Sequence, residues 1–152
     1  MVVMKDNMKF KKKIQKFNYP KDVDQELIYL LDVINSIPGV RTLFSCCGHG
    51  KEEFYIMLAY TSSQTRSLIE NAFSKNNLCI ENFNDDLTYK DVFIGKFKSH
   101  DFYNEPINDN IIFENCVGYY NTELGLATKK ERVKNYKKII KILTRLVPNE
   151  NW

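Results

Sequence analysis

Residues 40–60 read VRTLFSCCGHGKEEFYIMLAY, two apolar segments separated by a short loop of small, polar and reactive residues. The segments Val40 to Phe44 and Phe54 to Tyr60 are rich in aromatic and branched side chains, which predicts two strands. The loop from Ser45 to Gly50 holds two adjacent cysteines and a histidine between two glycines. Packing alone does not explain this concentration of chemistry, so we expect the functional site at this strand-to-strand connection.

Amphipathic segments and turn signals predict the elements on either side of this stretch. Apolar residues at three- and four-residue spacing predict a helix over residues 22–36, with Asp22 as its cap. A capping-box pattern at Thr61 and Gln64 predicts the start of a second helix. Strands are expected over residues 78–83, 89–97 and 111–120, a polar loop over 98–109 and a last helix over 128–147. This order predicts the α+β class: a single two-layer domain with three helices on a mixed or mainly antiparallel sheet of about five strands.

The composition is that of a soluble globular protein. The chain has 152 residues, of which 43% are hydrophobic and 27% charged, and it predicts a basic flexible arm over residues 1–16 and one domain over residues 17–152. No apolar run approaches the roughly 18 residues of a membrane span, so we expect no membrane partner and a location in the cytosol. The four cysteines are then expected to be reduced.

Basic residues concentrate at the two ends of the chain. Residues 1–16 carry six lysines and one acidic residue, and residues 128–145 carry eight basic residues and one acidic residue. The basic last helix is compatible with contact to the phosphates of nucleic acid. It is equally compatible with an acidic surface on a partner or with a face exposed to solvent.

The loop itself admits three kinds of chemistry. Gly48 and Gly50 permit positive φ, so backbone N–H groups can converge on an anion, with charge from Arg41, His49 or Lys51. A cysteine beside a histidine can also act as a nucleophile. Cysteine and histidine are zinc ligands too. However, two adjacent cysteines are badly spaced to bind the same tetrahedral ion, and the CxxC spacing is absent. A tight turn that needs glycine for its backbone is the structural alternative.

Of these, the residues favour ligand binding, and we predict no catalytic residue, metal or cofactor. Aromatic and histidine side chains elsewhere could complete the site by stacking on a base. The predicted ligand-binding residues are Arg41, Ser45, Cys46, Cys47, Gly48, His49, Gly50, Lys51, His100, Tyr103 and Tyr119.

The segments LLDVINS at residues 30–36 and SCCGH at residues 45–49, with Thr42 between them, carry a family resemblance. They resemble the helix–strand–loop start of the wybutosine-synthesising tRNA methyltransferase family. Phe44, Cys47 and His49 stand where that family has serine, serine and arginine, and the resemblance is confined to residues 30–49. The Ser-Cys-Cys-Gly-His-Gly loop is more similar to one in small proteins of low-GC bacteria and their phages. The resemblance implies a pocket suited to an adenosine-containing or nucleotide-like ligand.

We therefore expect a non-catalytic binding protein that sequesters a small anionic, nucleotide-like ligand. In a phage protein acting in the host cytosol, such a ligand would be a nucleotide-derived signal of host immunity, an anti-defence role. An RNA- or nucleotide-modifying enzyme related to the tRNA methyltransferases is the first alternative. A protein-interaction module that uses the basic C-terminal helix is the second. A second copy of the chain, forming a homo-oligomer, is a further candidate partner.

Overall fold

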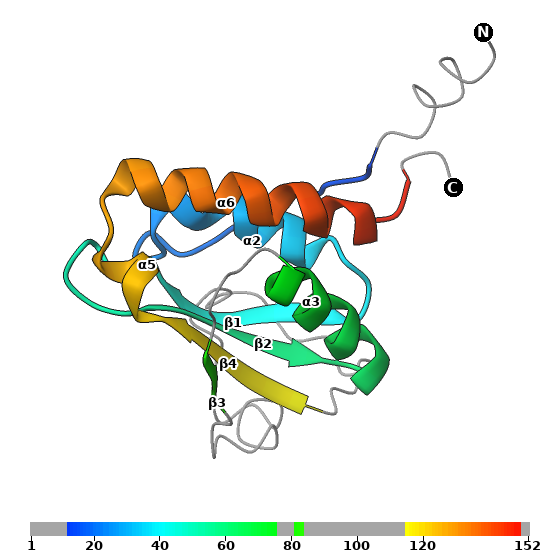
Figure 1. The fold of residues 1–152 in the computed structure, drawn as a ribbon. Helices are drawn as coiled ribbons and strands as arrows, with labels where there is room; N and C mark the ends of the chain where they lie inside the picture. The colour runs from blue at the N-terminus through cyan, green and yellow to red at the C-terminus, as the bar shows by residue number, and fades with distance from the viewer. Residues whose placement is uncertain (1–11, 76–80, 84–114, 150–152) are drawn as a thin grey trace, which may run out of the picture.

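The computed structural model describes residues 12–75, 81–83 and 115–149 (Figure 1). Its elements in chain order are the 3-10 helix η1 (Gln25–Leu27), α2 (Ile28–Asn35), β1 (Val40–Cys46), β2 (Phe54–Tyr60), α3 (Ser63–Lys75), β3 (Glu81–Phe83), β4 (Asn115–Asn121), α5 (Thr122–Leu126), α6 (Lys129–Leu143) and the 3-10 helix η3 (Thr144–Leu146). The predicted α+β class is confirmed. Among the described helices, none is long and apolar enough to cross a bilayer.

The strands form one sheet in the order β1-β2-β4-β3. Every neighbouring pair is antiparallel, as predicted for the main part of the sheet. The described residues hold four strands and four α-helices, where about five strands and three helices were expected. The predicted strand over residues 89–97 and the loop over 98–109 lie outside the described residues, so the fifth strand stays a prediction.

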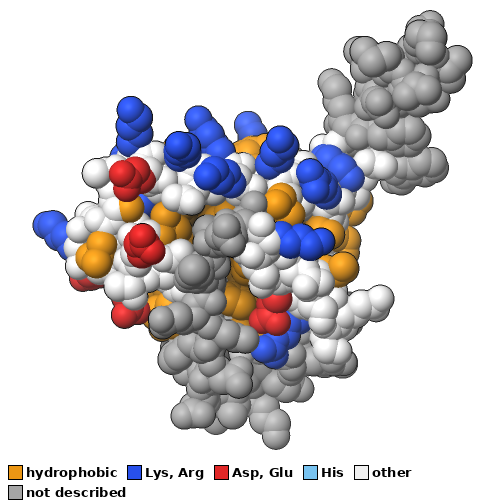
Figure 2. Space-filling view, in the orientation of Figure 1, with side chains coloured by type: hydrophobic (Ala, Val, Ile, Leu, Met, Phe, Trp, Pro, Cys, Tyr) orange, Lys and Arg blue, Asp and Glu red, His pale blue; other side chains and the backbone are white. Residues whose placement is uncertain are grey.

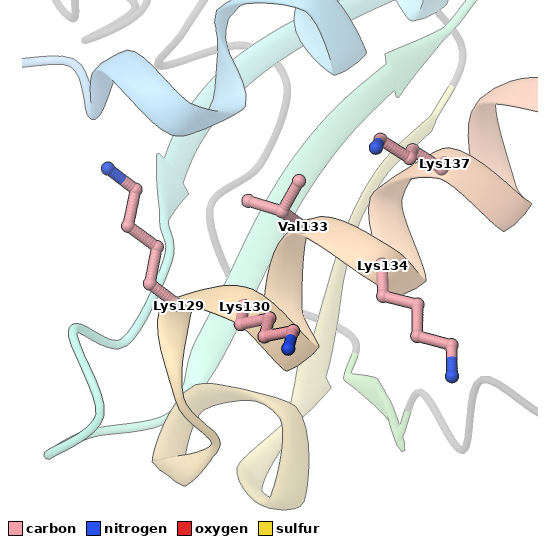
Figure 3. Close-up of a pocket in the computed structure, with 5 residues that line it drawn as sticks. All are labelled: Lys129, Lys130, Val133, Lys134 and Lys137. Carbon is pink, nitrogen blue, oxygen red and sulfur yellow. The ribbon is translucent and has the colours of Figure 1, made fainter.

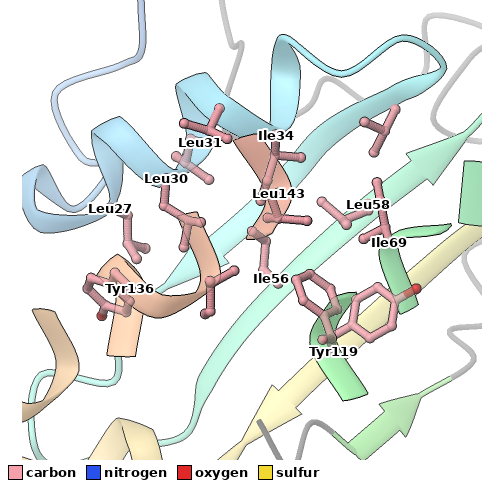
Figure 4. Close-up of a cluster of buried hydrophobic side chains, with 14 of the residues drawn as sticks. Leu27, Leu30, Leu31, Ile34, Ile56, Leu58, Ile69, Tyr119, Tyr136 and Leu143 are labelled. Atoms are coloured by element: carbon pink, nitrogen blue, oxygen red, sulfur yellow. The ribbon is translucent and has the colours of Figure 1, made fainter. Parts of the chain in front are cut away.

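Helices α2, α3 and α6 lie on one side of the sheet (Figure 1). Side chains alternate along a strand, so Ile56, Leu58 and Tyr60 of β2 face these helices while Met57 and Ala59 belong to a separate buried cluster. Figure 4 shows the main cluster between the helices and the sheet. Its fully buried members from several elements are Leu27, Leu31, Ile34, Ile56, Leu58, Ile69 and Leu143. Burial of a side chain of this size stabilises a fold by about 1.5–3 kcal/mol.

The first described residues lie beside the end of the chain. Lys12 pairs with Asn149 in an isolated bridge, and the Lys13 N–H donates to the Pro148 carbonyl at 2.8 Å. Further along, the Gln15 N–H donates to the Ser36 hydroxyl at the end of α2. Of the predicted basic arm, residues 12–16 are therefore joined to the folded domain, and residues 1–11 lie outside the described part of the chain.

Two predicted helix caps are wrong. The first helical turn begins at Gln25 rather than after Asp22, and the Asp24 carboxylate binds the loop that follows β1 instead of its own helix. In α3 the capping oxygen belongs to Ser62, which accepts from the Thr65 N–H at 3.2 Å. The predicted cap Thr61 donates instead to the Gly39 carbonyl.

A chain of hydrogen bonds from two buried tyrosine hydroxyls to a partly exposed carboxylate joins the sheet to α3. The Tyr119 hydroxyl of β4 donates to Glu70 Oε2 at 2.7 Å and lies 2.8 Å from the Tyr60 hydroxyl of β2. Because Tyr119 has only one hydroxyl proton, Tyr60 is the donor in the second bond. Burial raises the pKa of both phenols, so both remain protonated donors at neutral pH.

We predict that Tyr119→Phe lowers the free energy of unfolding by about 1–3 kcal/mol, because it leaves the buried Tyr60 hydroxyl without its acceptor. Urea unfolding measures the change. The matched control is Tyr29→Phe, whose side chain is exposed and which should stay within about 0.5 kcal/mol of the native chain. Equal losses in the two variants would contradict the prediction.

Candidate functional site

The loop between β1 and β2 has three consecutive residues in the left-handed region. The φ angles are 85° for Gly48, 55° for His49 and 77° for Gly50. The Lys51 and Glu52 N–H groups both donate back to the Gly48 carbonyl, at 2.9 and 2.8 Å. A residue other than glycine rarely adopts positive φ, so the surrounding structure must hold His49 in this conformation.

Gly125 of α5 supplies that restraint. Its carbonyl accepts from the Gly50 N–H at 2.8 Å. A Cβ on Gly48 would lie 2.4 Å from Gly125 Cα, and a Cβ on Gly125 would lie 2.1 Å from the Glu52 carbonyl oxygen. The loop and α5 therefore touch backbone to backbone, and both positions require glycine.

The backbone N–H groups of the loop are already bonded within the protein. The Cys47 N–H donates to Asp24 Oδ2, the Gly48 N–H donates to Cys46 Sγ, and the Gly50 N–H donates to Gly125. The anion cradle expected from Gly48 and Gly50 is therefore not formed, because its donors have protein acceptors.

Three side chains with metal-ligand chemistry meet beside the loop. The Asp24 Oδ1 atom lies 3.3 Å from His49 Nε2, and the ligand atoms of Asp24, Cys46 and His49 all lie within 4.8 Å of one another. Behind them, Cys47 Sγ lies 3.4 Å from His49 Nδ1. The side chain of Asp24 is 18% exposed and that of His49 is 55% exposed, so the cluster is open to solvent.

The surroundings of the two cysteines oppose thiolate formation. Burial raises the pKa of Cys47 to about 12, and the charges of Asp24 and Glu26 add to the effect. Burial also raises the pKa of Cys46, with further contributions from Asp24 and Glu52. Reactive cysteines sit in electropositive surroundings, so the free-thiol nucleophile considered for this loop gains no support.

A buried ion pair ties the segment carrying Asp24 to α6. The Glu26 carboxylate accepts from Arg132 Nε at 3.0 Å and Nη2 at 2.8 Å, and from the Tyr136 hydroxyl at 2.8 Å. The side chains of Glu26 and Arg132 are 9% and 6% exposed. Burial pushes the Glu26 pKa upward, but the hydrogen bonds from Arg132 and Tyr136, together with the charge of Arg132, outweigh it and hold the pKa below its usual range. Glu26 is therefore ionised at neutral pH.

The structure brings together only part of the predicted ligand-binding set. The loop after β1 holds five of them, namely Cys47, Gly48, His49, Gly50 and Lys51. Cys46 is the last residue of β1, and Ser45 is buried beside it in the strand. Arg41 precedes Cys46 by five residues on β1, about 17 Å away along an extended strand. The Tyr119 ring is only 3% exposed and packs edge-on against Phe73, so it offers no face for stacking. His100 and Tyr103 lie outside the described residues.

Sequence reasoning missed Asp24, Glu26, Gly125 and Arg132. Asp24 is 22 positions before Cys46, and no local pattern connects residues so far apart. Arg132 did carry a signal, because it precedes the buried Tyr136, Ile139 and Leu143 at helical spacing on α6. Its position in that stripe, rather than its charge, indicated burial.

No family model, curated protein or solved structure matches this chain. The resemblance to the wybutosine-synthesising tRNA methyltransferases therefore stays a prediction.

We predict that Gly125→Ala lowers the free energy of unfolding by about 1–3 kcal/mol, because the new methyl group overlaps the backbone of the loop. The same change inside an unobstructed helix stabilises by about 1 kcal/mol, so the sign of the effect tests the contact. Urea unfolding provides the measurement. Leu126 is exposed in the same helix, so Leu126→Ala is a control that should change the free energy of unfolding very little. A more stable Gly125→Ala variant would contradict the close packing.

A second prediction concerns acid stability. The folded-state pKa of Glu26 is depressed, so its stabilising contribution is present above the unfolded pKa of about 4.3 and is lost as the pH falls through the folded value. We expect Glu26→Gln to be less stable by about 3–5 kcal/mol at pH 7, because Arg132 loses its buried partner. The difference between the two chains should shrink as the pH falls below about 4. Urea unfolding across this range gives the comparison, and a constant difference would rule out the linkage.

Proposed function

We propose that this protein binds a small phosphate-bearing ligand of nucleotide size over the basic face of α6, without transforming it. A hollow of about 550 Å³ beside α6 carries the proposal. The described residues that line it are Lys129, Lys130, Val133, Lys134 and Lys137 (Figure 3). The hollow is open to solvent, and the described residues that line it all belong to α6.

The charge of this surface supports an anionic ligand. Lys129 and Lys130 lie in the first turn of α6, where the positive end of the helix dipole disfavours cations by about 0.3–1 kcal/mol each. A bound phosphate would be attracted by both the lysines and the helix end. Arg132 does not belong to this surface, because it is buried against Glu26.

The charges around the loop after β1 also favour a ligand site on α6 over one at the loop. The carboxylates of Asp24 and Glu52 raise the pKa of Cys46, and their negative charge would repel a phosphate. The anionic ligand expected at residues 45–51 is therefore better matched by α6, and the proposal keeps the ligand class while changing its location.

A nucleic-acid strand is the second candidate, because the basic residues extend beyond the hollow. Figure 2 shows lysine and arginine side chains gathered over α6, where Lys138 and Lys141 continue the series. A helix of 15 residues is about 22 Å long, which is long enough to contact several phosphates.

We predict that the double variant Lys130→Glu, Lys134→Glu weakens binding of a nucleotide on the order of 100-fold, because each lysine contributes a charge-assisted contact. Isothermal calorimetry with nucleotides, cyclic nucleotides and ADP-ribose derivatives, chosen after a thermal-shift screen, measures the affinity. Recovery of unaltered ligand after the titration tests the absence of turnover.

The matched control is Lys138→Glu, Lys141→Glu, which makes the same change in net charge on exposed residues of α6 that do not line the hollow. It should weaken nucleotide binding much less than the Lys130→Glu, Lys134→Glu variant does, since these side chains do not line the hollow and act only through charge screened over about 8–10 Å. Equal weakening of RNA binding by both double variants, with a steep salt dependence, would favour the nucleic-acid candidate. The proposal fails if no nucleotide in the panel stabilises the native chain.

A further inference from the structure

The cluster of Asp24, Cys46 and His49 has the separations of a metal site. In a tetrahedral zinc site with Zn–N and Zn–O bonds of about 2.0–2.2 Å, the nitrogen and oxygen ligands lie about 3.4 Å apart. The His49 Nε2 and Asp24 Oδ1 atoms lie 3.3 Å apart. Cys46 Sγ completes a group within 4.8 Å, so a movement of about 1 Å brings all three ligands to bonding distance.

We propose that Asp24, Cys46 and His49 bind one Zn²⁺ ion, with the fourth coordination position open to solvent. Without metal the Cys46 thiol is protonated, so binding of the ion releases that proton to solvent and leaves a thiolate ligand. A thiolate, an imidazole and a carboxylate are all zinc ligands, and three protein ligands with one free position are typical of reactive rather than structural sites. The exposure of His49 agrees with an open position. The free position would accept water or an oxygen or nitrogen donor from a small ligand.

The two adjacent cysteines have different roles, one as a metal ligand and the other as a partner of the ligating histidine. Adjacent thiolates are a poor bite for a single ion, and here only Cys46 belongs to the ligand group. Cys47 is buried and its Sγ atom lies 3.4 Å from His49 Nδ1. A partner on the second ring nitrogen fixes the orientation of a ligating histidine, so Cys47 is a positioning residue.

The Asp24 carboxylate is also oriented before any ion binds. Its Oδ2 atom accepts from the Cys47 N–H at 2.8 Å, which leaves Oδ1 directed toward His49 Nε2. The His49 residue has a φ of 55°, and its imidazole lies against this carboxylate. Because the ligands are already placed by bonds within the protein, little ordering is required when the ion binds.

The charge of the site favours a cation. Asp24 and Glu52 both act on the Cys46 thiol, and the Asp24 carboxylate lies against His49. A divalent ion would offset this concentration of negative charge. The site is independent of the lysine-lined hollow, so either proposal can fail without the other.

Titration of the purified full chain with Zn²⁺ or Co²⁺ tests the site. After removal of bound metal by a chelator, we expect binding of one ion per chain. With Co²⁺ we expect a thiolate-to-cobalt charge-transfer band in the near ultraviolet. Failure to bind one ion per chain at micromolar concentration would overturn the proposal.

Matched variants assign the ligands. Cys46→Ser should abolish the charge-transfer band, whereas Cys116→Ser, a cysteine on β4 outside the cluster, should leave it intact. His49→Asn removes the imidazole while keeping a residue that tolerates positive φ, and Asp24→Asn keeps an acceptor for the Cys47 N–H. Each should weaken zinc binding by more than the roughly 10–100-fold that follows loss of an outer-shell partner.

Cys47→Ser separates positioning from ligation. It should weaken zinc binding by about 10–100-fold while the charge-transfer band survives, because the ligating thiolate is unchanged. Circular dichroism and thermal unfolding without metal confirm that each variant folds. Unchanged zinc affinity in both His49→Asn and Asp24→Asn, in folded protein, would overturn the site.

Discussion

The backbone contact between Gly48 and Gly125 is the constraint on which the site depends. Neither residue has space for a Cβ atom, so the loop after β1 and the short helix α5 after β4 are held together through their main chains. These strands are not neighbours in the sheet, since β2 lies between them. The contact therefore joins the loop to the end of β4 and restrains the backbone of His49, whose φ is positive and whose imidazole lies 3.3 Å from Asp24.

The buried pair of Glu26 and Arg132 places the other half of the site. Taking two charges out of water costs several kcal/mol, which a bidentate geometry with additional hydrogen bonds offsets. Here Tyr136 and the Ala127 carbonyl supply those additional bonds. The pair joins residues 106 positions apart, and Asp24 lies two residues before Glu26. The position of Asp24 thus depends on α6, although α6 supplies no member of the cluster.

The elements with strong local patterns could be predicted from the sequence. Strand β2 was predicted with its observed bounds, because seven apolar residues between polar segments are a local signal. The site could not be predicted to the same degree, because Asp24 and Gly125 meet the loop through tertiary contacts. Tyr119 shows that the residue type alone does not predict whether a side chain binds a ligand or packs in the core. A tyrosine can offer its ring to a ligand or bury it with its hydroxyl bonded, and only the sheet register, which places Tyr119 opposite Ile56, decides between them.

The distribution of charge separates two kinds of chemistry on one small domain. Carboxylates surround the loop, so a cation is stabilised there and a phosphate is repelled. Lysines cover α6, including its first turn, where the helix dipole attracts an anion. The Arg132–Glu26 pair adds no net charge to the loop, although Arg132 Nη1 lies 3.8 Å from where a Cβ on Gly50 would be. Asp24 and Glu52 therefore supply the negative charge beside Cys46, while exposed lysines supply the positive charge of α6.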